Sequence, residues 1–501
     1  MHTPPPDNPL IITAQTLRHL LTCERRVWLD QHGDLAQRDP TSPSTQRLYT
    51  LGIRHEERIH AATTHTIEPV DVESWEDAVV ATHDLMQQGV PGIIGACLET
   101  IAPLDLTGRM FTIRGKIDQL LRQPGHDGYS YAPVEIKQRA SAVEADHVQL
   151  DLYLWLLGFV QDSVPHGELW LGADAYGRPR RRVLHEYDDD RLMTALTRTA
   201  ALLDASPEPP VKIEPHCAHC PWYGPCQHIA QREKRIDLLY RVSGKTRANM
   251  EQAGITTLAH VATLSPADLQ QIKGIGPVTA PAIHANARAW LEERPIRHQP
   301  LAETCFRPGW MFDLETVEVR GQTVPWCMGW CDTEGQTQIT LVGPVQVPEP
   351  LALPDGQTVT LVPDSDSAWE VLAEATASHS DDASPIYHWT GYDVGMLRTT
   401  APPEIRQQLE PHFHDLHATI TRAISFPLCS TSIKTISAYL GYPWPGYNNW
   451  FAAYLDYKYW LDGGDLDVLA RACTYQRADV QSMAWVWRWL MASYPAEDTN
   501  T

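Results

Sequence analysis

The chain has 501 residues, enough for about three domains. Hydrophobic residues make up 43% of it, but no run of about eighteen apolar residues occurs, which argues against a membrane-spanning helix. The formal net charge of −22 excludes a generally basic surface, so any contact with phosphate groups would need local basic patches. The first residues lack the basic and apolar regions of a secretory signal, and we therefore expect a cytoplasmic protein.

The first part of the chain, residues 1–236, has the pattern of an α/β domain with a mixed sheet. Helical periodicity alternates there with segments in which apolar and polar residues alternate, as they do in strands. The candidate helices are residues 14–29, 75–88 and 145–160, and the candidate strands are residues 111–121 and 129–136.

Four of the ten cysteines form a pattern that is typical of metal ligands. Cys23 stands near the start of the chain, and Cys217, Cys220 and Cys226 follow far downstream. Soft thiolate ligands at this spacing suit an iron–sulfur cluster or zinc. A zinc ribbon usually carries two Cys-x-x-Cys pairs, and the single pair here favours the cluster.

Between these cysteines lie side chains that suit metal-dependent hydrolysis of phosphodiester bonds. Glu135 and Lys137 are two residues apart on a candidate strand and therefore share one face. Asp118 closes the preceding candidate strand. Two carboxylates from adjacent strands can share a divalent metal, while a lysine can orient the attacking water and stabilise developing charge.

Three further side chains extend this set. His55 offers a nitrogen ligand, which favours Mn²⁺ alongside Mg²⁺. Gln149 and Tyr153 are one helical turn apart and share a face, from which they can position a phosphate or the scissile strand.

The order of these motifs resembles the RecB-type branch of the PD-(D/E)XK nucleases. The motifs are Gly-x-x-His, Gly-Lys-Ile-Asp, Val-Glu-Ile-Lys, Gln-x-x-x-Tyr and the cysteine cluster. The sequence looks most like the iron–sulfur members of that branch, and the resemblance covers roughly the first half of the chain. It implies a restriction-endonuclease-like core that uses Mg²⁺ or Mn²⁺. It also implies a [4Fe–4S] cluster, with zinc as the alternative, on Cys23, Cys217, Cys220 and Cys226.

The middle part, residues 237–297, reads as a small all-helical unit. The segment around Lys273, Gly274 and Gly276 resembles a helix–hairpin–helix motif, in which glycines allow a tight turn between two helices. Backbone amides at the start of the second helix can hold a phosphate without formal charge. The alternative is a helical spacer that contacts no DNA.

The last part, residues 298–501, again mixes strand and helix patterns. Its first candidate strand ends in acids at Asp313 and Glu315, and a second follows at residues 337–342. Residues 348–356 read as a proline-rich loop. The candidate helices are residues 367–377, 403–412, 432–440 and 465–491.

A second set of acids lies in this part. Asp313 and Glu315 share a strand face, and Tyr475 and Asp479 lie one turn apart on a candidate helix. Asp393 follows another apolar strand, although the asparagine usual before such an acid is missing. The order resembles the DnaQ-like exonuclease branch of the RNase H fold. This resemblance implies two metal ions, with the four acids as ligands and Tyr475 aligning the attacking water.

Asp415 competes with Asp393 for the third position in this set, with orientation of a helix as its alternative role.

The succession of the three parts resembles a family of uncharacterised prokaryotic RecB-like nucleases. It implies a Mg²⁺- or Mn²⁺-dependent hydrolase, an exodeoxyribonuclease that acts on single-stranded DNA or DNA ends, with a second centre trimming from 3′ ends. No Walker motif is present, so unwinding would need a separate helicase, or a repair or defence partner. Two alternatives stay open: an RNA-processing nuclease, and a non-catalytic iron–sulfur DNA-binding subunit of a repair, CRISPR or defence complex.

Overall fold

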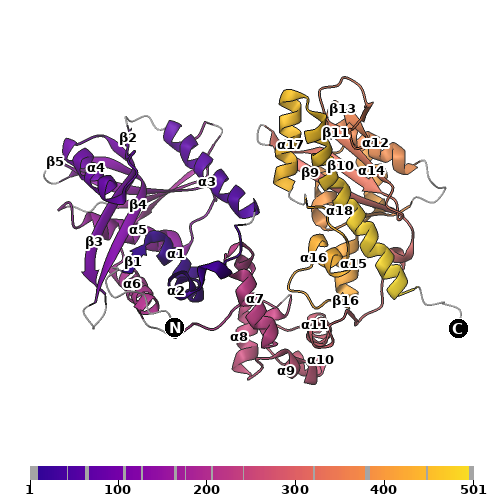
Figure 1. The fold of residues 1–501 in the computed structure, drawn as a ribbon, viewed down its shortest axis with the longest axis horizontal. Coiled ribbons are helices and arrows are strands. Elements are labelled where there is room, and N and C mark those ends of the chain that lie inside the picture. The colour runs from indigo at the N-terminus through magenta and orange to yellow at the C-terminus, as the bar shows by residue number, and fades with distance from the viewer. Residues whose placement is uncertain are drawn as a thin grey trace. The chain divides into compact units, whose positions relative to one another are not determined.

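The computed structural model divides into two compact units, Met1–Cys226 and Gln227–Thr501 (Figure 1). No helix among the residues that the structure describes is long and apolar enough to cross a bilayer. The described residues are 10–41, 43–62, 67–104, 109–125, 128–162, 166–174, 176–204, 207–240, 242–319, 322–377, 384–446 and 450–495.

The first unit is built on a seven-stranded mixed sheet, as its sequence pattern predicts. The strands β2 to β7 follow one another in chain order across the sheet, and β1 pairs in parallel with β4. The β3–β4 and β4–β5 pairs are antiparallel, whereas β5 and β6 are parallel. The strands are β1 (Leu10–Thr13), β2 (Ile67–Pro69), β3 (Gly92–Pro103), β4 (Met110–Gly125), β5 (Gly128–Lys137), β6 (Gly167–Leu171) and β7 (Arg181–His185).

Helices cover both faces of this sheet. On one face, Leu17, Leu150 and Leu196 of three different helices pack with the buried side chains of β4. On the other face, Ile59 packs against Val134 of β5 and its neighbours. The helices are α1 (Ala14–Thr22), α2 (Glu24–His32), α3 (Pro43–Ala62), α4 (Trp75–Gln88), α5 (Glu144–Leu157), α6 (Asp189–Asp204) and α7 (Tyr223–Arg232), the last of which continues into the second unit.

The prediction of one helix over residues 14–29 is wrong at Cys23. There the backbone is extended, with φ −162° and ψ 106°, so that Cys23 ends α1 and begins α2. A single residue with strand-like dihedrals interrupts a helix without changing the apolar periodicity on either side, and the pattern therefore could not show the break. The prediction of a helix over residues 145–160 is confirmed by α5 (Glu144–Leu157), which has Gly158 as its C-cap and so ends three residues earlier than predicted.

The second unit also contains a seven-stranded sheet, in the order β12-β13-β11-β10-β9-β14-β15. The strands are β9 (Trp310–Val319), β10 (Gln322–Cys331), β11 (Thr337–Val342), β12 (Glu349–Ala352), β13 (Thr358–Val362), β14 (Ile386–His388) and β15 (Phe413–Asp415). The helices with this sheet are α12 (Ser365–Ala377), α13 (Gly391–Thr400), α14 (Pro403–Leu409), α15 (Leu416–Ala423), α16 (Ile433–Tyr439), α17 (Trp450–Gly463) and α18 (Leu466–Ser493). The long α18, yellow in Figure 1, packs against β9, β10 and β11.

The proline-rich stretch predicted as a loop at residues 348–356 contains a strand, β12. This strand lies at the edge of the sheet and pairs only with β13 among the described strands. Pro350 is tolerated there because an edge strand does not need every backbone N–H for a ladder.

The second unit begins with a group of short helices and includes a two-stranded sheet. The helices are α8 (Gly244–Gln252), α9 (Leu258–Thr263), α10 (Pro266–Leu269) and α11 (Thr279–Glu292), and the sheet pairs β8 (Ile296–Arg297) with β16 (Ile424–Ser425). The turn between α10 and α11 carries Gly274 at φ 100°, a conformation that favours glycine.

The close approach of α5 to β4 gives a first prediction. A Cβ atom at Gly115 would stand 2.7 Å from Leu156 Cδ1 and 3.1 Å from the ring of Tyr153. Gly115→Ala should therefore destabilise the first unit by about 1–3 kcal/mol, seen as a lower midpoint of thermal unfolding. Gly52→Ala on α3 is the matched control, because no atom lies within 4 Å of its Cβ position, and it should be neutral or stabilising by up to about 1 kcal/mol. Equal midpoints for the two variants would contradict the packing.

Candidate active sites

The first candidate site forms where β4 and β5 separate. Their antiparallel ladder ends at the pair Gln119–Val134, so Asp118 and Glu135 are the first residues beyond it. The backbone N–H of Ile136 donates to Asp118 Oδ2 at 2.8 Å. Lys137 Nζ forms an ion pair with Glu135, which is buried. The structure thus brings Asp118, Glu135 and Lys137 together. The prediction that Asp118 closes its strand is wrong, because β4 continues to Gly125.

The electrostatics of this site suit a bound cation. Burial and the neighbouring Asp118 carboxylate raise the pKa of Glu135 to about 8, and burial raises the pKa of Asp118 to about 6. Glu135 Oε2 and His55 Nε2 are buried and have no hydrogen-bond partner among the residues that the structure describes. Burial also lowers the pKa of His55, so its ring is neutral and the unpartnered nitrogen can act as a metal ligand.

The structure adds Glu56, which the sequence reading missed. Glu56 lies on α3 beside His55, and burial raises the pKa of its carboxyl group, with opposing contributions from Lys137 and Glu135. It therefore lies within electrostatic reach of the same acids. Its position directly after the candidate ligand His55 was the only signal in the sequence.

Gln149 and Tyr153 are engaged within the protein. Gln149 Nε2 donates to Tyr153 Oη at 2.7 Å, and Tyr153 Oη donates to the carbonyl oxygen of Lys116 at 2.6 Å. Arg18 of α1 donates to Gln149 Oε1 at 2.9 Å and to Asp146 Oδ1 at 3.1 Å. These bonds connect α1, α5 and β4 directly beside the acids, and Arg18 was not foreseen.

The four predicted cluster cysteines also gather in the first unit. Burial raises the pKa of the Cys217 thiol to about 11, and the thiols of Cys23, Cys220 and Cys226 add to the shift. Arg25 Nε donates to Cys226 Sγ at 3.4 Å, and the backbone N–H of Glu214 donates to Cys217 Sγ at 3.4 Å. Such donors stabilise a thiolate.

The sulfur atoms of Cys23, Cys217, Cys220 and Cys226 do not form a close group of ligands. Within the described residues, no three of these four atoms lie within 4.8 Å of one another. A single zinc ion binds each sulfur at about 2.3 Å and would draw its ligands closer than that.

The second candidate site lies between β9 and α18 in the second unit. Ligand oxygens of Asp313, Glu315 and Asp479 lie within 4.8 Å of one another. Burial and the charge of Asp479 raise the pKa of Glu315 to about 8, and burial raises the pKa of Asp479 to about 6. Burial and the charges of the other acids also raise the pKa of Asp313 well above its usual value.

Asp393, at the start of α13, lies near this group but outside the 4.8 Å set. Burial raises its pKa to about 7, and its charge in turn contributes to the shifts of Asp313 and Glu315. The competing Asp415 is the N-cap of α15: its Oδ1 accepts from the backbone N–H of Ala418 at 2.7 Å. The structure therefore assigns Asp415 the helix-capping role.

Three residues support the acids of the second site. Lys434 Nζ donates to Tyr475 Oη at 3.0 Å, and Tyr475 in turn shares hydrogen bonds with Glu315 and Asp479. Gln476 Nε2 donates to Asp313 Oδ2 at 3.0 Å. Lys434 was not among the predicted site residues, although it lies in the candidate helix of residues 432–440.

The predicted helix–hairpin–helix turn is held by α8. A Cβ at Gly274 would stand 2.6 Å from Thr246 Oγ1, and Asn249 Nδ2 donates to the carbonyl oxygen of Lys273 at 2.7 Å. The backbone N–H of Gly276 donates to Thr279 Oγ1 at 3.0 Å. The Lys273 side chain is exposed, so the turn presents it to solvent.

Comparisons with known proteins find one nuclease-related superfamily in each unit. Residues 13–227 match the PD-(D/E)XK nuclease superfamily, and residues 310–491 match the RNase H superfamily. No curated protein matches the sequence. The solved structure titled "Crystal structure of SSO0001" matches at 15% sequence identity over 44% of this chain and 86% of that chain. Its TM-score of 0.25 is too low to indicate a shared fold. The protein is thus an α/β multidomain protein with a PD-(D/E)XK domain and an RNase H-like domain.

The raised carboxyl pKa values predict a link between pH, metal and stability. Unfolded carboxyl groups have pKa values of about 4, so between about pH 4 and 8 the metal-free folded protein binds more protons and loses stability as the pH rises. A cation replaces these protons, so Mn²⁺ should raise the unfolding midpoint more at about pH 8 than at about pH 6.

This effect is measured by thermal unfolding in chelator and in Mn²⁺. Asp313→Asn should reduce the Mn²⁺ shift, while the control Glu374→Gln, at an exposed position of α12, should keep it. A shift that is the same at both pH values would argue against metal binding by these acids.

Proposed function

We propose that this protein is a metal-dependent nuclease that hydrolyses DNA phosphodiester bonds in single-stranded DNA or at DNA ends, with a second, 3′–5′ exonuclease-like centre. The observation that carries the proposal is the gathering of ligand oxygens of Asp313, Glu315 and Asp479 within 4.8 Å, where Asp479 is buried and the other two acids are half-buried. Like charges at this range repel one another strongly and are stable together only when protonated or bound to cations. The two nuclease-superfamily matches point the same way.

In the first centre, Asp118, Glu135 and His55 are the candidate ligands of Mg²⁺ or Mn²⁺. A bound divalent cation supplies Lewis acidity, which activates water and neutralises phosphate charge. Lys137 forms an ion pair with Glu135 and can orient the attacking water or stabilise the charge that develops on the phosphate. Arg18 and Gln149 hold α5 in register with the acids.

In the second centre, Asp313, Glu315, Asp393 and Asp479 are the candidate ligands. Burial and the surrounding acids raise the pKa of Tyr475 far above its usual value, so its hydroxyl keeps its proton and can donate to a water or a phosphate oxygen. Lys434 balances part of the negative charge, since it lowers the pKa values of Glu315 and Asp479.

Because the chain is acidic overall, contact with DNA requires local features that bind phosphate groups. We propose the domain limits 1–236 for the nuclease domain, 237–297 for the helix–hairpin–helix and 298–501 for the exonuclease domain. The exposed turn at Lys273, Gly274 and Gly276 would then bind a phosphate of DNA, with backbone amides as donors.

We also propose a [4Fe–4S] cluster on Cys23, Cys217, Cys220 and Cys226. Four thiols within electrostatic reach, two of them accepting N–H hydrogen bonds, suit its ligand chemistry. When bound, the cluster would tie the break between α1 and α2 to the segment that leads into α7.

An RNA-processing nuclease is the second candidate, because the RNase H superfamily match does not distinguish the two polymers. A non-catalytic DNA-binding subunit is the third. The presence of two complete acid sets argues against it.

Cleavage assays with matched variants test the proposal. Glu135→Gln should lower first-centre cleavage by on the order of a hundredfold or more, and Asp313→Asn should do the same for stepwise trimming from 3′ ends. The substrates are end-labelled single-stranded DNA and the corresponding RNA, with Mg²⁺ or Mn²⁺, and the controls are Asp84→Asn in the first unit and Glu374→Gln in the second, both at exposed positions.

Failure of the wild-type protein to cleave either polymer would favour the DNA-binding subunit. Preferential cleavage of RNA would favour the processing enzyme.

The cluster is tested without reference to activity. Anaerobically purified protein should be brown, with about four irons per chain and broad visible absorption. Cys220→Ala should lose iron and unfold at a lower temperature. The control Cys97→Ala should keep its iron, because Cys97 is a buried residue of β3 and is not among the thiols that shift the pKa of Cys217. A colourless wild-type protein that holds one zinc per chain would refute the cluster.

A further inference from the structure

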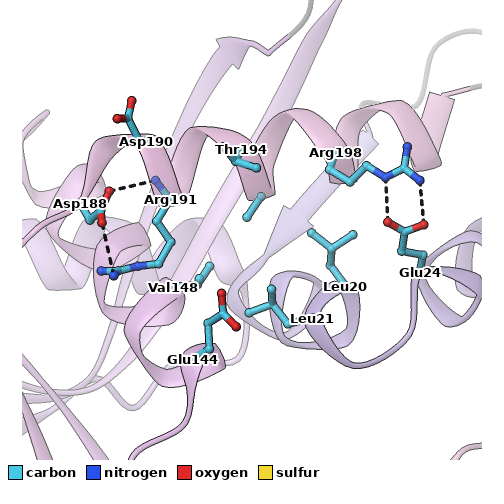
Figure 2. Close-up of a pocket in the computed structure, with 11 residues that line it drawn as sticks. Leu20, Leu21, Glu24, Glu144, Val148, Asp188, Asp190, Arg191, Thr194 and Arg198 are labelled. Atoms are coloured by element: carbon cyan, nitrogen blue, oxygen red, sulfur yellow. Dashed lines mark hydrogen bonds and ion pairs between the residues drawn. The ribbon is translucent and has the colours of Figure 1, made fainter. Parts of the chain in front are cut away.

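A groove lies between α1, α5 and α6 of the first unit, lined by residues that neither candidate site uses. Its volume is about 660 Å³, and it opens to solvent (Figure 2). Along α6, Arg191, Thr194 and Arg198 recur every three or four residues, so they share one face. The groove therefore follows about two turns of α6, or roughly 10 Å.

The middle of the groove is apolar. Leu20 and Val148 are buried in its floor, and Leu21 lies between them and solvent with 39% of its surface exposed. Figure 2 shows these three side chains between the ion pairs at the two ends of the groove. An exposed leucine in a hollow of this kind offers a contact for another apolar side chain.

The arginines at the groove are already neutralised by carboxylates of the protein. Arg198 forms two hydrogen bonds to Glu24, at 2.8 and 2.7 Å. Arg191 forms two hydrogen bonds to the buried Asp151, at 2.6 and 3.0 Å, and a longer ion pair with Asp188. Neither arginine is therefore available for a phosphate or another anion.

Two further carboxylates form no ion pair at contact distance, although the charge of Glu144 contributes to the raised pKa of Arg191. Glu144 and Asp190 line the groove, both are exposed, and neither forms an ion pair with any residue in the part of the chain that the structure describes. In Figure 2, Glu144 points into the space between Leu21 and the Arg191 side chain. The groove thus combines an apolar floor with excess negative charge, on a chain whose net charge is −22.

We propose that this groove binds an amphipathic helix of a partner protein. Two turns of such a helix present apolar side chains at positions i, i+3 or i+4 and i+7, which match the length of the floor along α6. Its apolar side chains would contact Leu21 and Val148, and lysine or arginine side chains beside them would pair with Glu144 and Asp190. The sign of the charge disfavours nucleic acid as the occupant.

The position of the groove connects a bound partner to the first candidate site. The same α1 that supplies Leu20 and Leu21 carries Arg18 and ends at Cys23. The same α5 that supplies Glu144 and Val148 carries Gln149, which accepts from Arg18. A helix in the groove would therefore press on the two helices whose contact supports the acids, although the binding itself does not depend on nuclease activity.

Fluorescence anisotropy with the full-length protein tests the proposal. The probe is a labelled synthetic helix of about 14 residues, four turns long, with leucines on one face and lysines on the other. The comparison peptide keeps the leucines and replaces each lysine with glutamate. The lysine peptide should bind at least about tenfold more tightly than the glutamate peptide.

Variants at exposed positions locate the binding. Glu144→Lys combined with Asp190→Lys should weaken binding of the lysine peptide about tenfold or more, and Leu21→Ser should weaken it as well. Asp84→Lys, at an exposed position of α4, makes the same kind of charge change away from the groove and should leave binding unchanged. Unfolding midpoints close to that of the wild-type protein would show that the fold is intact.

Three results would overturn the proposal. The first is absence of binding, or equal affinity for the two peptides, in the wild-type protein. The second is displacement of the bound peptide by a single-stranded oligonucleotide, which would assign the groove to nucleic acid. The third is self-association of the wild-type protein that Leu21→Ser abolishes, which would assign the groove to a second copy of the chain.

Discussion

The fold has to hold buried carboxylates close together against their own repulsion. In the second unit, Asp313, Glu315 and Asp479 come from one strand and one helix, and the charge of Lys434 offsets part of the charge of Glu315 and Asp479. Gln476 and Lys434 supply the nearest donors. The repulsion raises the carboxyl pKa values and makes this part of the unit receptive to cations, which is what a metal-dependent hydrolase requires.

Small details of packing make this arrangement possible. Gly329 of β10 pairs with Asp313 of β9, and a Cβ there would stand 2.7 Å from Gln476 Cγ. The absence of a side chain at Gly329 therefore lets α18 approach the sheet closely enough for Gln476 to bond Asp313. Asp479, one turn along α18 from Tyr475, reaches the acids of β9 for the same reason.

The first unit meets the same constraint differently. Asp118 and Glu135 sit just beyond the end of a strand ladder, where no backbone partner fills the space between them. Here a single lysine forms the ion pair, and α3 contributes His55 and Glu56 from the opposite side of the sheet from α5. The extended backbone at Cys23 ends α1 and begins α2, so that this cysteine lies at the junction of the two helices, five residues after Arg18.

The sequence by itself determined the residue types and their order: two acid sets, four distant cysteines, and α/β patterns that the sheets confirm. Local periodicity is enough for this, because it is a property of neighbouring residues. Only the tertiary structure decided that Arg18, Glu56 and Lys434 adjoin the acids and that Asp415 caps a helix. Contacts between residues far apart in the chain depend on strand order and on the packing of helices against sheets, and a single sequence carries no direct record of either.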